Sequence, residues 1–164
     1  MRRTWAPRGQ TPLVVHPFRW KKLSIACAIS YRPTSTRTRL CFQIVTDSYN
    51  EQKLIGFLQR LKRHFRGQRT VLIWDGLPSH RNRIMSTYLA EQRSWLRIVR
   101  LPGYAPDLNP VESLWANVRG QELANRSVDE LGEMIRGVHD AFRRIRRRRH
   151  LLGSFLQHAG LSLA

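Results

Sequence analysis

The segment "RTVLIWD" (residues 69–75) is a nearly continuous apolar run that stops at an acid. Such a run is typical of a strand buried on both faces of a sheet. Asp75 would then lie at the carboxyl end of the strand, where α/β proteins concentrate ligands and catalytic groups. Asp is also a good turn initiator, so Asp75 has a structural alternative as the first residue of the turn "DGLPSH".

The chain before this segment predicts a hairpin and a helix. "KKLSIACAIS" (21–30) and "RLCFQIVT" (39–46) are short, apolar and partly β-branched, and the residues between them suit a hairpin connection, so we expect two antiparallel strands. Apolar residues at helical spacing then predict an amphipathic helix across about 50–66. Ser48 and Glu51 stand three apart before it, the spacing of a capping box.

The chain after this segment alternates between helix and strand. Residues 79–93 predict a helix and residues 95–101 a strand, followed by a helix from about residue 110 and a longer one from Ser127. The last helix carries an apolar stripe, which consists of Val128, Leu131, Ile135, Val138, Phe142 and Ile145. Two strands followed by strand, helix, strand and helix predict an α/β fold with a mixed sheet, in one domain over residues 1–164.

The charge balance points to a polyanionic partner. The formal net charge is +18, with 29 basic residues against 11 acidic ones, and nearly all of the basic residues are arginine. Nucleic acid is the first partner to expect, although a GC-rich genome also enriches arginine. No segment approaches a membrane span or a secretory signal. Cys27 and Cys41 lack the spacing of metal ligands, which favours reduced thiols in a cytoplasmic protein.

A second acid, Glu112, lies in the dense Pro, Gly and Asn segment "LPGYAPDLNPVESLWANVRG" (101–120). Asn109 fits a helix N-cap, Pro110 fits the first helical position and Glu112 fits the third, which together form a capping-box arrangement. Capping explains these three residues. It does not explain the preceding "PGYAP", whose rigidity and aromatic ring an ordinary loop does not need.

"VLIWDGLPSH" followed by "VRLPGYAPDLNPVESLWANVRG" resembles the DDE transposase domain of the insertion-sequence 630 and Tc1–mariner superfamily. Asp75 and Glu112 match the second and third acids of the DDE triad, with 36 residues between them, as is typical of that group. The string "YAPDLNPVE" is the most specific part of the match. Gly76 departs from the Asn that usually follows the second acid. The resemblance runs from "RTWAPRGQTP" near the start to "LLGSFLQHAGL".

The resemblance implies a ribonuclease H-like fold, a mixed sheet flanked by helices, that cuts and joins DNA. It implies carboxylates that hold two Mg²⁺ (or Mn²⁺) ions, with Asp75 and Glu112 as catalytic metal ligands, since hard cations prefer oxygen donors. A cap and a metal ligand are compatible roles for Glu112, because the cap fixes the turn that aims its side chain. His80, Tyr104 and Asn109 are candidate supporting residues; a helix-start hydrogen bond is the alternative role for His80.

In the family the first Asp lies on the central strand, before the segment that resembles "RTWAPRGQTP". This chain contains no acid before Asp47, which follows the second expected strand and is favoured as a loop residue. We therefore expect a partial catalytic domain that lacks the central strand and the upstream helix-turn-helix region. Such a chain is expected to be inactive alone.

The run "RRIRRRRH" (143–150) is the candidate DNA-backbone site, with a solvated helix face as the alternative. Its candidate DNA-binding residues are Arg143, Arg144, Arg146, Arg147, Arg148 and Arg149. The expected partners are DNA (terminal repeats and target DNA), a second copy of the chain, and a separately encoded amino-terminal segment, at the bacterial nucleoid and without a membrane. A non-catalytic basic nucleic-acid-binding protein and an inert transposase remnant are the rival hypotheses.

Overall fold

The computed structural model describes residues 8–9, 23–32, 35–77, 80–103, 105–123 and 130–161. Its strands are β1 (Ser24–Arg32), β2 (Ser35–Val45), β3 (Thr70–Trp74) and β4 (Leu96–Arg100). Its helices are α1 (Glu51–His64), α2 (Arg83–Glu91), α3 (Pro110–Asn117), α4 (Leu131–Arg147) and α5 (Arg149–His158). A 3₁₀ turn, η2 (Pro106–Leu108), precedes α3, and a π-helical turn, η3 (Val118–Glu122), follows it. The predicted α/β class is confirmed.

The four described strands form two separate two-stranded sheets. β1 and β2 are an antiparallel hairpin, as predicted, while β3 and β4 pair in parallel. Within the described part of the chain, no strand lies between β1 and β3. Each therefore has one edge whose outward backbone groups have no ladder partner.

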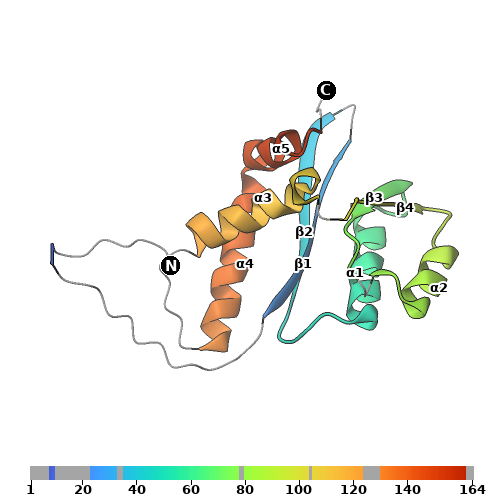
Figure 1. Ribbon diagram of the computed structural model, residues 1–164, viewed down its shortest axis with the longest axis horizontal. Coiled ribbons are helices and arrows are strands. Elements are labelled where there is room, and N and C mark those ends of the chain that lie inside the picture. The colour runs from blue at the N-terminus through green and yellow to red at the C-terminus, as the bar shows by residue number, and fades with distance from the viewer. Residues whose placement is uncertain are drawn as a thin grey trace.

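The β1–β2 hairpin is the centre of the molecule, because its two faces contact different helices. Alternate residues of a strand point to opposite faces. Ile25, Cys27 and Ile29 pack toward α3, α4 and α5, whereas Ala26 and Ala28 pack toward α1. Figure 1 shows this arrangement, with α3, α4 and α5 on one side of the hairpin and α1, α2, β3 and β4 on the other.

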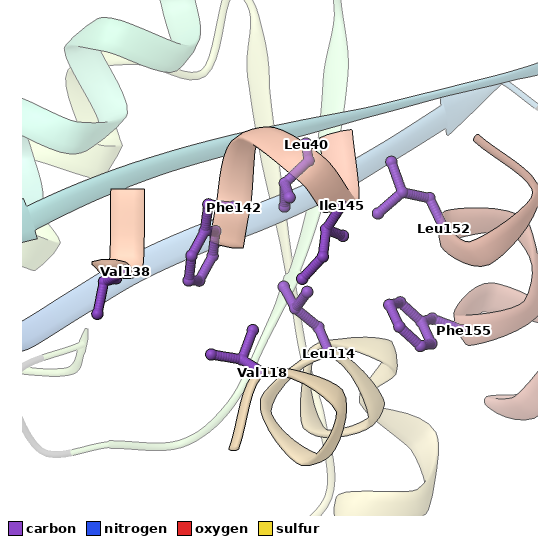
Figure 2. Packing of buried hydrophobic residues seen from close by; sticks show 8 residues of the cluster. All are labelled: Leu40, Leu114, Val118, Val138, Phe142, Ile145, Leu152 and Phe155. Atoms are coloured by element: carbon purple, nitrogen blue, oxygen red, sulfur yellow. The ribbon is translucent and has the colours of Figure 1, made fainter. Parts of the chain in front are cut away.

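The larger core joins β2 to α3, η3, α4 and α5. Its buried members are Leu40, Leu114, Val118, Val138, Phe142, Ile145, Leu152 and Phe155. Figure 2 shows these side chains converging between the strand and the helices. Trp115, half-buried, contacts Phe142 edge-on at 5.9 Å between ring centroids, so the expected core role of Trp115 is confirmed.

The second core holds the other sheet against α1. Its buried members are Leu54, Phe57, Leu58, Leu61, Met85, Trp95 and Leu96. Leu72 and Trp74 of β3 pack against it, but Val71 and Ile73 on the opposite face are 57% and 43% exposed. The expectation that this strand is buried on both faces is therefore wrong, because the helices that the structure describes cover one face of the β3–β4 pair and leave the other exposed.

Two local expectations also need correction. Asn50 caps α1 by accepting a hydrogen bond from Lys53 N at 3.0 Å, so Ser48 is not the cap. The long carboxyl-terminal helix is broken at Arg148, where φ is −90° and ψ is 76°, and a separate helix α5 follows. Ser127, where that helix was expected to begin, lies outside the described residues. In the described segments no helix has both the length and the apolar character to cross a membrane.

Candidate active site and basic surface

Asp75 directly follows β3, so the sheet places its carboxylate at the carboxyl end of a strand. The side chain is 46% exposed. One carboxylate oxygen accepts a hydrogen bond from Leu77 N at 3.3 Å and lies 2.9 Å from His80 Nδ1. The first contact is the turn interaction that the sequence allowed as the structural alternative. It leaves part of the carboxylate accessible to a ligand.

His80 is buried beneath this turn. Its ring stacks on Trp74 with 3.9 Å between ring centroids, and its Nδ1 also lies 3.2 Å from the Asp75 carbonyl oxygen. Its backbone N–H donates to Leu77 O at 2.9 Å. His80 therefore contacts both the backbone and the carboxylate of Asp75. Its predicted contact with a phosphate or metal-bound water stays a prediction.

Gly76, which departs from the usual Asn, is covered by Arg81. The Arg81 guanidinium donates two hydrogen bonds to the Gly76 carbonyl oxygen, one of them from Nε at 2.9 Å. A Cβ atom added at Gly76 would lie 3.0 Å from Arg81 Nη2. A larger residue here would displace the guanidinium, so Gly76 and Arg81 fit each other.

Glu112 lies in the first turn of α3, as the sequence predicts. Asn109 caps the helix by accepting a hydrogen bond from Val111 N at 3.2 Å, and Pro110 occupies the first helical position. The Asn109 N–H, however, donates to Pro106 O at 2.9 Å, so the Glu112 carboxylate does not close a capping box. The predicted N-cap at Asn109 is confirmed, and the predicted capping box with Glu112 is not. The exposed carboxylate is therefore free to interact elsewhere.

Its electrostatic neighbour is Cys27 of β1. Burial first, and the negative charge of Glu112 second, raise the pKa of the Cys27 thiol far above its ordinary value. The start of α3 thus places the acid beside the central hairpin. Asn109 and Pro110 produce this orientation by fixing the first turn.

Asp75 and Glu112 contact different parts of the fold. Asp75 lies at the end of β3 with His80, whereas Glu112 lies beside β1, and these strands belong to separate sheets. No cluster of three His, Cys, Asp or Glu side chains suited to a metal occurs among the residues that the structure describes. Asp47 pairs with Lys53 in the loop after β2 and has a 71% exposed side chain, which agrees with its expected loop role.

The arginine run does not act as one surface. Arg144 and Arg148 bind Glu122 of η3, with Nη-to-carboxylate distances of 2.7 and 3.4 Å, and the Glu122 side chain is only 7% exposed. Arg146 instead places its guanidinium carbon 5.1 Å from the centre of the Phe42 ring. Pairing with Glu122 gives Arg144 and Arg148 a structural role that the sequence did not reveal.

Three basic residues that the sequence did not single out lie near Arg146. Arg39 on β2 and Arg60 and His64 on α1 line a common cleft with Arg146 and Arg149. Their one signal in the sequence is the spacing of Arg60 and His64, four residues apart on a helix and thus on one face. Tyr104, a candidate supporting residue, lies outside the described residues.

Comparisons with known proteins agree with the motif. Residues 1–135 match the family described as DDE superfamily endonuclease. An insertion element IS630 uncharacterized 39 kDa protein of Shigella sonnei is 28% identical over 135 residues, which cover 82% of this chain. The match covers 38% of that relative, so this chain spans about two fifths of its length.

The fold resembles solved transposase structures. The catalytic domain of Mos1 mariner transposase superposes with a TM-score of 0.52 at 16% identity, over 87% of this chain and 83% of that chain. A Mos1 mariner paired-end complex with Mn gives a TM-score of 0.59 at 17% identity, over 99% of this chain and 52% of that chain. The expected ribonuclease H-like architecture is confirmed at the level of the fold.

Proposed function

Because the chain belongs to the DDE superfamily endonucleases, we propose that it is the catalytic part of a transposase that cleaves and joins DNA at insertion-sequence ends. The observation that carries the proposal is the placement of two motif acids. Asp75 ends a strand and Glu112 begins a capped helix beside the central hairpin. A binding protein without catalysis would not need the string "YAPDLNPVE".

Asp75 and Glu112 are the proposed ligands of divalent metal. Both carboxylates are accessible, and oxygen donors suit Mg²⁺ or Mn²⁺. When bound, two such ions would activate the attacking water or 3′-hydroxyl and stabilise the leaving oxygen. Asp75 is positioned by Leu77 and His80, and Glu112 by the Asn109 cap. The Mos1 complex with Mn supports metal use in this fold.

We propose that activity needs a further strand between β1 and β3 that carries a third acid. Both strands have an unpaired edge within the described residues, and Asp75 ends a strand of one sheet whereas Glu112, on α3, lies beside the other. A strand paired to both would join the sheets and bring a third ligand between Asp75 and Glu112. Without this strand the site lacks both the negative charge of a third carboxylate and the geometry that holds the metal ions. Such a loss typically lowers the rate by ~10²-fold or more.

The test is a strand-cleavage assay on terminal-repeat DNA with Mn²⁺. The chain is assayed alone and after co-expression with a separate segment that supplies a strand carrying an acid. We expect background cleavage by the chain alone and efficient cleavage by the reconstituted protein. Asp75→Asn and Glu112→Gln should each reduce the reconstituted rate by about 10²–10³-fold.

Asp107→Asn is the matched control, because Asp107 is an exposed acid in the adjacent turn η2. Efficient cleavage by the chain alone would remove the need for a third acid from outside. Equal loss in Asp107→Asn and Glu112→Gln would remove the special role of Glu112. Metal-independent DNA binding without cleavage in either preparation would favour the non-catalytic binder or the inert remnant.

The proposed partners are terminal-repeat and target DNA at the bacterial nucleoid, together with a second copy of the chain. The paired-end Mos1 complex supports the second copy, since pairing two ends suits a two-fold assembly. Light scattering of the reconstituted protein with and without terminal-repeat DNA measures this stoichiometry.

A further inference from the structure

The outer edge of β2 borders a cleft of about 320 Å³. α1 forms one wall of this cleft, and the joint between α4 and α5 forms the other. Its basic side chains are Arg39, Arg60, His64, Arg146 and Arg149. No acidic residue lines it, although the volume is within the range of pockets that hold small ligands. A second hollow shares Arg60 and His64 and adds Arg63.

Charges in the cleft are uncompensated within the described residues. No ion pair there involves Arg39, Arg60, Arg146 or Arg149, whereas the neighbouring Arg144 and Arg148 pair with Glu122. Arg144 and Arg148 therefore hold the fold together, whereas Arg146 and Arg149 face the cleft without counter-charge, as an anion site requires. The other two arginines of the run, Arg143 and Arg147, lie outside the cleft.

Two backbone features border the cleft, whose positive potential comes from its side chains. β2 pairs only with β1 among the described strands, so its other edge, near the cleft, presents backbone N–H and C=O groups without ladder partners. α5 begins at Arg149 with no side-chain cap, so the positive end of its dipole lies at this joint, where the negative end of the α4 dipole also lies. Phe42 supports the cleft by holding the Arg146 guanidinium over its ring.

We propose that this cleft binds a phosphate of the DNA backbone, as a site separate from the two metal-binding acids. The identity of the polyanion rests on the proposed function. Separation follows from the fold, since Glu112 lies beside Cys27 on β1 and the cleft opens at the far edge of β2. DNA bound in the cleft would be held by β2, α1, α4 and α5 rather than by the two metal-binding acids.

His64 reports on the cleft because cations face it from every wall. Arg39 comes from β2, Arg60 from α1 itself, Arg146 from α4 and Arg149 from α5. Burial, then Arg39 and Arg146, lower the pKa of the His64 imidazole below its ordinary value. A bound phosphate would oppose these cations and raise that pKa, so binding should strengthen as the pH falls through it.

The test measures DNA binding in EDTA, where cleavage plays no part. Arg39→Gln/Arg60→Gln removes two exposed arginines from the cleft, and Arg143→Gln/Arg147→Gln removes two exposed arginines outside it. Anisotropy with a short fluorescent duplex is recorded between about 50 and 200 mM salt. Each lost phosphate contact should lower the log–log salt slope by about 0.9. We expect a fall of roughly one to two for the cleft variant and less than half of that for the control.

The second measurement is the NMR titration of His64 in wild type and in the cleft variant, with inorganic phosphate and then with duplex DNA. A raised His64 pKa in wild type, lost in the variant, supports the site. Equal slopes for the two double variants, or no response of His64, overturn it. If the reconstituted cleft variant retains cleavage and its salt slope is unchanged, the proposed phosphate site in the cleft is overturned. The proposed function is then left intact. Saturation of His64 by polyglutamate but not by DNA overturns the proposal in favour of an acidic protein strand.

Discussion

The pKa of the Cys27 thiol reports on the position of the Glu112 carboxylate. The thiol is held in its neutral form because burial and the nearby carboxylate both oppose the thiolate. A raised pKa in the folded state means that the unfolded chain loses this proton first as the pH rises. The stabilising contribution is therefore complete below the ordinary thiol pKa of 9.0 and is lost as the pH rises above it.

We predict that the free energy of unfolding decreases above about pH 9 and that Cys27→Ala makes this decrease shallower. Glu112→Gln should speed alkylation of Cys27 at pH 9 by a few-fold, because it removes the smaller of the two causes of the raised pKa. Denaturant titrations across pH and mass-spectrometric alkylation measure the two effects. An unchanged alkylation rate in Glu112→Gln would mean that this carboxylate does not face β1.

At the residue scale the sequence predicted the roles that depend on local chemistry. The N-cap at Asn109 and the proline after it follow from the preferences of a helix start. The cap of α1 was misplaced by two residues, since Ser48 and Asn50 both make good caps and only the end of β2 decides between them. The role of Glu122 depends on contacts across the fold and had no local signal. His64 also depends on such contacts, and its one local signal is its spacing from Arg60.

At the scale of the element, β3 has one covered and one open face. Leu72 packs against the core that contains α1, whereas Val71 and Ile73 point to solvent, beside Val99 of β4 at 44% exposure. The run "VLIW" predicted the strand correctly. The run could not show which helices lie on each face of the strand. An apolar run is also compatible with a face that a further segment of protein covers.

We predict that Val71→Thr/Ile73→Thr lowers aggregation of the isolated chain and changes the free energy of unfolding by less than about 0.5 kcal/mol. Leu72→Ala on the opposite face should cost ~2 kcal/mol, since it removes packing from the core. Urea denaturation and light scattering measure both. Similar destabilisation by the two variants would show that Val71 and Ile73 are covered in solution.

The break between α4 and α5 has a signal that is visible in retrospect. The apolar stripe of α4 ends at Ile145, and the positions one turn later are Arg148 and Arg149 before burial resumes at Leu152. A continuous helix would have carried these two arginines toward the core. The same arginines also predict a DNA-binding run. The sequence alone therefore did not show whether they mark the end of a helix or a binding surface.

At the scale of the whole molecule, the excess positive charge is divided between arginines that are paired within the fold and arginines that line the cleft. Glu122 neutralises one part of the arginine run, and the cleft at β2 retains another part without acids. Composition predicted a polyanionic partner but not where it binds. That location depends on contact between β2 and α1 on the one side and α4 and α5 on the other, two pairs of elements that are far apart in the chain.

Two sheets that share no ladder also affect how the molecule folds. The hairpin of β1 and β2 closes a short loop, whereas β3 and β4 pair only after the chain crosses through α2, so the first sheet should form sooner. Because no ladder joins the two sheets within the described residues, their cooperativity depends on side-chain contacts, chiefly the packing around α1. We expect amide hydrogens of β3 and β4 to exchange with deuterium faster than those of β1 and β2, through opening that leaves the hairpin intact. Uniform protection in both sheets would mean that they unfold as one unit. A strand that bridges them should equalise the exchange rates, so deuterium uptake would follow assembly of the catalytic site before any DNA is cut.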